Sequence, residues 1–157
     1  MKLLPSLDVV LSEIKTALAD QSELISSSDI KLGVLLGLSG LILAALLGST
    51  SVYYSNMATR VLFILAVALI LVSLLSTTWG YWIRKYKALP SPSALREFYL
   101  MEEPQKTKLA LVDYLCSVYD WNQKRLVSKL RCLKISFICV LLSAIIMGVI
   151  VLHILAS

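Results

Sequence analysis

Residues 32–59, LGVLLGLSGLILAALLGSTSVYYSNMAT, contain no Asp, Glu, Lys, Arg or His. Two further stretches, 61–83 and 135–152, are also free of these residues. Each stretch is close to or longer than the roughly 18 to 20 residues that a helix needs to cross a hydrocarbon core. The whole chain is 58% hydrophobic and only 16% charged, which is far from the composition of a soluble domain. The sequence therefore predicts an all-α integral membrane protein with three transmembrane helices.

The basic residues lie almost entirely on one side of these predicted spans. Of the fifteen Lys and Arg residues, three precede the first span, eleven lie between Arg84 and Lys134, and Arg60 alone follows the first span. Because cytoplasmic loops carry the excess of basic residues, we expect the N-terminus in the cytoplasm and the C-terminus outside. The expected location is the inner (plasma) membrane. An acidic amphipathic segment precedes the first apolar run, which argues against a cleaved signal peptide.

The N-terminal segment, residues 1–29, predicts an amphipathic cytoplasmic helix. One face of this helix is apolar, and the remaining faces are too polar for the helix to cross a bilayer. The apolar face therefore needs a partner, either in the same chain or in another subunit. The run Ser26–Asp29 breaks the pattern and is expected to cap the next helix. The apolar face follows alternating steps of three and four, as in a heptad seam, through Leu4, Leu7, Leu11, Ile14, Leu18, Gln21 and Ile25.

Small residues recur on one face of the first predicted span. In lipid, helices associate through close backbone approach and van der Waals packing, which stripes of small residues permit. The partner of this stripe is either the second span of the same chain or another copy, and the second alternative predicts a homo-oligomer. The residues expected to mediate helix packing or oligomerisation are Gly33, Gly37, Gly40, Ala44 and Gly48.

The predicted two-span hairpin occupies residues 30–86, and the composition changes after it. Ser91-Pro92 is a good helix start, so we expect a short helix to about Leu100 and a break at Glu102–Pro104. From Pro104 no Gly or Pro occurs until Gly148. This predicts one helix that runs from a cytoplasmic helical region, residues 87–131, into a third transmembrane helix, residues 132–157. The face expected to pack against the N-terminal helix contains Lys108, Val112, Leu115, Tyr119, Leu126, Leu130 and Leu133.

Polar side chains at the inner ends of the spans are candidates for a pore or gate. Two simpler alternatives exist: hydroxyls bond back to a carbonyl of the preceding turn, and Asp29 pairs with Lys31 or caps the helix. The candidates are Asp29, Lys31, Ser73, Ser76 and Thr77.

A basic run just before the third span is a candidate for contact with lipid headgroups or with phosphates of a nucleotide or nucleic acid. The simpler alternative is a positive-inside anchor. Beside this run, Tyr119 and Trp121 either stack on a base or belong to a buried helical face. The basic candidates are Lys124, Arg125, Lys129, Arg131 and Lys134.

No catalytic, phosphate-binding or metal-binding motif occurs in the sequence. The single histidine, His153, is expected at the outer membrane interface. Cys116, Cys132 and Cys139 have no metal-ligand spacing, and we expect them to be reduced packing residues. The sequence therefore predicts a protein that is not an enzyme and has no cofactor and no metal.

Part of the sequence resembles a known group of membrane proteins. The resemblance covers SSDIKLGVLLGLSGLILAALL at 27–47, the second span, and LPSPSALREFYL at 89–100 before a long charged helix and a final span. This layout resembles small bacterial membrane proteins of the Pycsar-effector and SLATT kind, most clearly at Asp29, Lys31, Gly37 and Gly40. The resemblance implies a membrane-damaging role in nucleotide-signalled antiphage defence.

From these patterns we expect an oligomeric pore-forming or membrane-permeabilising effector. Its expected partners are membrane lipids and further copies of the chain, and its trigger is a cytosolic protein or a nucleotide that acts on the cytoplasmic helices. The alternative is a non-conducting membrane anchor or accessory subunit that recruits a soluble partner. A small transporter is disfavoured because no charge lies within a predicted span.

Overall fold

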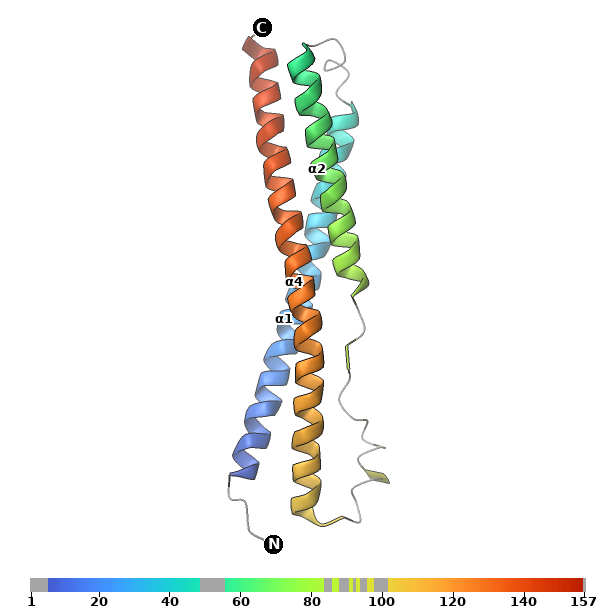
Figure 1. Cartoon of the computed structure of the whole chain (residues 1–157), viewed down its shortest axis with the longest axis vertical. Coiled ribbons are helices and arrows are strands. Elements are labelled where there is room, and N and C mark those ends of the chain that lie inside the picture. Colours follow the sequence, from blue (N-terminus) through green and yellow to red (C-terminus); the bar gives the residue numbers. More distant parts are fainter. Residues whose placement is uncertain are drawn as a thin grey trace. The chain divides into compact units, whose positions relative to one another are not determined.

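Three long helices make up most of the computed structural model (Figure 1). The structure describes residues 6–48, 56–83, 86, 87, 91, 93, 96, 97 and 102–156. The helices are α1 (Leu7–Gly48), α2 (Met57–Trp82) and α4 (Pro104–Ala156), and the described residues contain no strand. Each helix is long and apolar enough to cross a membrane, as the sequence predicts.

Helix α1 continues without a break through the serine run that was expected to end it. It has 42 residues, so the prediction of a helix cap at Ser26–Asp29 is wrong. Serine costs only a few tenths of a kcal/mol in a helix interior, and the buried face of α1 passes straight through the run. Gln21, Ser28 and Leu32 are 3%, 4% and 1% exposed, and tertiary packing thus outweighs the local capping preference.

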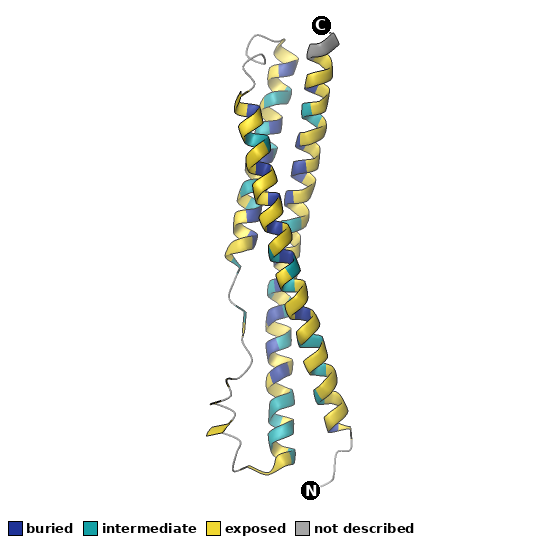
Figure 2. Ribbon diagram, turned by 180° about the vertical axis from the view of Figure 1, so that it is seen from behind, coloured by how far each residue is buried: buried dark blue, intermediate teal, exposed yellow. Residues whose placement is uncertain are grey.

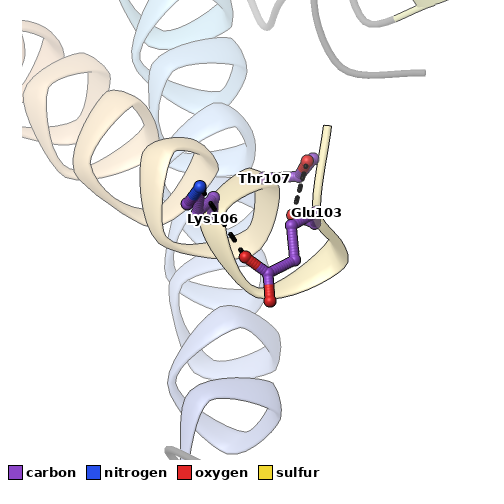
Figure 3. Close-up of polar contacts among 3 residues, drawn as sticks. All are labelled: Glu103, Lys106 and Thr107. Carbon is purple, nitrogen blue, oxygen red and sulfur yellow. Dashed lines mark hydrogen bonds and ion pairs between the residues drawn. The ribbon is translucent and has the colours of Figure 1, made fainter. Parts of the chain in front are cut away.

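Helix α4 confirms the prediction of a single helix from Pro104 into the third apolar stretch, with 53 residues. Proline suits the first helical position, where no N–H bond is lost. Figure 3 shows the residues at this helix start. The N–H of Thr107 donates to the carbonyl of Glu103 at 3.1 Å, and the Glu103 carboxylate lies 3.7 Å from the ammonium of Lys106. The predicted short helix to Leu100 lies mostly outside the described residues.

The chain divides into two compact units. The first contains Met1–Ser26 and Arg84–Val127, and the second contains Ser27–Ile83 and Ser128–Ser157. Figure 2 shows the buried positions as stripes along the helices. Both units use parts of α1 and α4, and α2 belongs to the second.

In the first unit, the N-terminal part of α1 packs against the N-terminal part of α4. Gln21 Nε2 donates to the carbonyl of Tyr119 at 3.2 Å and to Gln123 Oε1 at 3.1 Å. Asp8 Oδ1 lies 2.6 Å from Lys108 Nζ. These contacts confirm that the N-terminal helix has a partner in its own chain, as one of the two alternatives predicts. Asn122 is buried in this unit. Leu130, expected on the packing face of α4, belongs to the second unit and is 43% exposed, whereas Lys129 beside it is buried.

In the second unit, α1, α2 and α4 share an apolar core made of Leu35, Leu46, Ala66, Ile70 and Val140. Large apolar side chains also cover the outside of this unit. Leu41, Ile64 and Leu152 are 71%, 67% and 69% exposed, and an extended apolar outer surface is typical of a site that contacts a membrane or another protein. Three candidate spans and this outer surface indicate a multi-pass membrane protein.

Candidate functional site

A row of hydrogen-bonded serines crosses the interior of the second unit. Ser39 on α1 and Ser73 on α2 have their Oγ atoms 2.9 Å apart, and Ser73 and Ser136 on α4 have theirs 2.6 Å apart. All three side chains are 0% exposed. Ser73 is therefore the central member of a hydroxyl chain that links the three helices.

Two more hydroxyls on this face bond across helices. Ser143 Oγ donates to the carbonyl of Ala66 at 3.3 Å, and Ser76 Oγ donates to the carbonyl of Cys132 at 3.0 Å. Thr77 bonds back to the Ser73 carbonyl at 2.9 Å. Back-bonding is thus confirmed for Thr77 but wrong for Ser73 and Ser76, because a neighbouring helix is close enough to offer each of them a partner.

A buried ion pair lies near one end of the same unit. Lys129 Nζ is 2.5 Å from Asp29 Oδ1, and the Lys129 side chain is 0% exposed, whereas that of Asp29 is 38% exposed. The prediction that Lys129 contacts lipid headgroups or phosphates is therefore wrong. The predicted pairing of Asp29 with Lys31 is also wrong, because Asp29 pairs with Lys129 and Lys31 is exposed.

Close helix packing adjoins the ion pair. A Cβ atom placed on Gly80 would lie 3.1 Å from Cys132 Cβ and 3.2 Å from Leu32 Cδ1. Leu32 and Cys132 are each three residues, about one turn, after Asp29 and Lys129. A larger residue would need Cys132 and Leu32 to shift by a few tenths of an ångström, so glycine at position 80 favours the close approach of α2 to the other two helices next to the ion pair.

The predicted small-residue stripe faces away from the other helices of the chain. A Cβ atom placed on Gly33, Gly37, Gly40 or Gly48 would have no neighbour within 4 Å, and Ala44 is exposed. Packing of this stripe against the second span of the same chain is therefore wrong, because α1 presents its Leu32, Ser39 and Leu46 face to the core instead. Packing against another copy stays a prediction.

The other predicted residues lie at the surface or beside Trp121. Lys124, Arg131 and Lys134 are exposed, whereas the guanidinium of Arg125 lies 5.1 Å from the centre of the Trp121 ring. Trp121 is 42% exposed, so it does not belong to a buried face.

The remaining predictions concern His153, Tyr119 and the three cysteines. His153 is exposed and Tyr119 is partly buried. The three cysteines are free, but only Cys139 is buried, and Cys116 is exposed, so a packing role is wrong for Cys116. Within the described residues no group of His, Cys, Asp and Glu could hold a metal ion.

Strict sevenfold spacing explains which polar residues the sequence analysis missed. On α4, buried positions recur every seven residues, and four of them are polar: Asn122, Lys129, Ser136 and Ser143. On α2 the same spacing joins Thr59, Ala66, Ser73 and Gly80. A seven-residue repeat keeps one face inward in left-handed helix packing. Testing for this repeat inside the apolar stretches would identify Ser136, Ser143 and Gly80 from the sequence.

The hydrogen-bonded serines and the Asp29–Lys129 pair can hold α1, α2 and α4 together, and they keep their polar groups inside the second unit, away from its apolar outer surface. Comparison with known proteins adds no relative to this geometry: no protein-family model, no curated protein and no solved structure matches the chain.

Proposed function

We propose that this protein is a membrane-permeabilising protein that assembles as a homo-oligomer in the inner membrane, with its N-terminus in the cytoplasm and its C-terminus outside. The observation that carries the proposal is the polar row inside apolar helices, which consists of Lys129, Ser136, Ser143 and the partners Asp29, Ser39 and Ser73. Asp29 and Lys129 lie just outside the charge-free stretches 32–59 and 135–152, and polar or ionisable groups that face the interior of membrane helices mark ion pathways and switches.

The described conformation is the closed state in this proposal. Its hydroxyls satisfy one another and are 0% exposed, so a pathway needs the helices to separate or rotate. The Asp29–Lys129 pair joins α1 to α4 and holds them together. A bundle with two alternative packings is the kind of element that a gate requires.

The outward glycine face of α1 supplies the surface for assembly. Gly33, Gly37 and Gly40 are exposed and a Cβ on each would meet no other atom, while glycine costs about 1 kcal/mol of helix propensity relative to alanine in soluble hosts. Backbone contact with another copy would offset that cost in lipid. The resemblance to small bacterial membrane effectors is consistent with a role in antiphage defence, triggered through the cytoplasmic helices.

The test is release of trapped ions and dye from vesicles that contain the purified full-length chain. We expect release that rises steeply with the protein-to-lipid ratio and that increases in Asp29→Asn, because this variant breaks the ion pair of the closed state. Gly37→Leu with Gly40→Leu should abolish release and assembly. Ala68→Leu, a matched control at an exposed position of α2, should change neither.

Two results would contradict the proposal. One is retention of the trapped ions by vesicles containing folded wild-type protein and by vesicles containing Asp29→Asn, at every protein-to-lipid ratio. The other is release that persists while Gly37→Leu with Gly40→Leu leaves the chain monomeric.

A second function, a non-conducting membrane anchor, is favoured by a separate observation. The first unit has an open groove of about 420 Å³ between α1 and α4, a surface on which a soluble partner can dock. Tight vesicles, together with a stoichiometric cytosolic protein that is lost in Ile14→Asp, would support this function. The groove is lined by Glu13, Ile14, Ala17, Cys116, Tyr119 and Asp120.

A further inference from the structure

Two cations of the first unit share one aromatic ring. Lys87 Nζ and the guanidinium carbon of Arg125 each lie 5.1 Å from the centre of the Trp121 ring. The ring is 42% exposed, and Lys87 is exposed beside it. Cation–π attraction therefore holds both positive charges at a surface that ligands can reach.

Within the part of the chain that the structure describes, neither charge has an acidic partner. Among the ion pairs of the described residues, none joins Lys87 or Arg125 to a carboxylate. Because each lies 5.1 Å from the same ring centre, the two are at most about 10 Å apart, a separation comparable to the Debye length of about 8–10 Å at 0.15–0.1 M salt. Their mutual repulsion is relieved when an anion binds between them.

Asn122 fixes the position of one of these cations. Its Oδ1 accepts the backbone N–H of Lys87 at 2.9 Å, and its Nδ2 donates to the Lys87 carbonyl at 3.2 Å. Asn122 is only 6% exposed, so a buried amide is used to attach Lys87 to α4. The cluster is thus held in place from two separate segments of the chain.

We propose that Lys87, Trp121 and Arg125 form a binding site for the phosphate headgroup of an anionic lipid. Arginine binds phosphate through two parallel N–H bonds, lysine acts as a point charge, and tryptophan favours the membrane–water interface. In the sequence, Lys87 comes five residues after Trp82, the last residue of α2, and basic residues next to a span bind anionic headgroups. The proposal rests on the membrane placement of the chain and not on permeabilisation.

The experiment uses the full-length chain in neutral detergent, with Trp79 and Trp82 replaced by phenylalanine so that Trp121 is the only tryptophan. Its fluorescence is titrated separately with dihexanoyl phosphatidylglycerol, dihexanoyl phosphatidylcholine and inorganic phosphate. We expect a saturable change with phosphatidylglycerol only. Each cation near an anionic lipid contributes about a fivefold gain in affinity, so Lys87→Gln with Arg125→Gln should weaken binding by about 25-fold.

Three variants separate charge from structure. Lys15→Gln with Lys106→Gln removes two exposed cations from the same unit and should leave the affinity unchanged. Lys87→Arg with Arg125→Lys retains both charges and should keep most of the binding. Asn122→Ala should weaken phosphatidylglycerol binding while retaining the helical circular dichroism spectrum, because Lys87 loses its backbone attachment.

Three results would overturn the proposal. Equal responses to phosphatidylcholine and phosphatidylglycerol would show that the site does not select an anion. Saturation by inorganic phosphate at the same concentration as the lipid would identify a soluble anion as the ligand. An equal loss of affinity in the Lys15 and Lys106 control would show that only net charge matters.

Discussion

Breaking the Asp29–Lys129 pair tests the central contact of the second unit. In Asp29→Asn the Lys129 ammonium, which is 0% exposed, loses its carboxylate. In Lys129→Met an apolar side chain replaces the buried cation, and the remaining carboxylate of Asp29 is already 38% exposed. The two substitutions remove the same ion pair but leave very different groups behind.

The expected costs follow from these exposures. Removing one partner of a buried pair costs about 3–5 kcal/mol of unfolding free energy, because a charge is left without compensation. Partial exposure of Asp29 shows that solvent reaches one side of the pair, so we expect about 2–3 kcal/mol for Asp29→Asn. Lys129→Met should cost about 1 kcal/mol or less, since the remaining carboxylate keeps part of its hydration.

The measurement is unfolding by sodium dodecyl sulfate in dodecylmaltoside micelles, followed by helical circular dichroism. The double variant should be close to Lys129→Met, which gives a coupling energy between the two positions equal in size to the cost of Asp29→Asn, about 2–3 kcal/mol. If Asp29→Asn proves no more destabilising than Lys129→Met, the ammonium is hydrated in the folded protein, and the reasoning from a buried, compensated charge fails.

Two further predictions use the same unfolding measurement with matched controls. Gly80→Ala should destabilise by about 1–3 kcal/mol, because its methyl group would overpack against Cys132. In the control Gly37→Ala, the added methyl group meets no atom within 4 Å, so the monomer should keep its stability. Equal effects of the two substitutions would contradict the packing assigned to Gly80. Ser73→Ala removes both links of the serine chain and should cost about 1 kcal/mol, since interhelical hydrogen bonds in membrane proteins average about 0.6 kcal/mol each. The exposed Ser22, which bonds only to the Ala19 carbonyl, should tolerate alanine without loss, and a similar cost at both serines would remove the special role of Ser73.

Some features of the site were predictable and others were missed for a definable reason. Asp29, Ser73 and Ser76 were chosen from the sequence because polar groups at the ends of apolar stretches are conspicuous. Their partners Lys129, Ser39 and Ser136 could not be predicted in that way, because a pairing depends on the relative placement of two helices, which the pattern of one helix does not contain. Lys129 was grouped with surface cations by its neighbours in sequence, although its sevenfold spacing from Ser136 places it on the buried face.

The sequence by itself determined the number of long apolar helices, the start of α4 at Pro104 and the existence of one inward face on the N-terminal helix. These features depend on hydropathy and on short-range periodicity, which each segment carries independently of the rest. The tertiary structure decided that α1 continues through Ser26–Asp29, that Gly80 rather than the α1 glycines makes the close contact within the chain, and that Lys129 lies inside. Each of these outcomes depends on which face of one helix meets another, because burial and pairing free energies arise only when the helices are packed together.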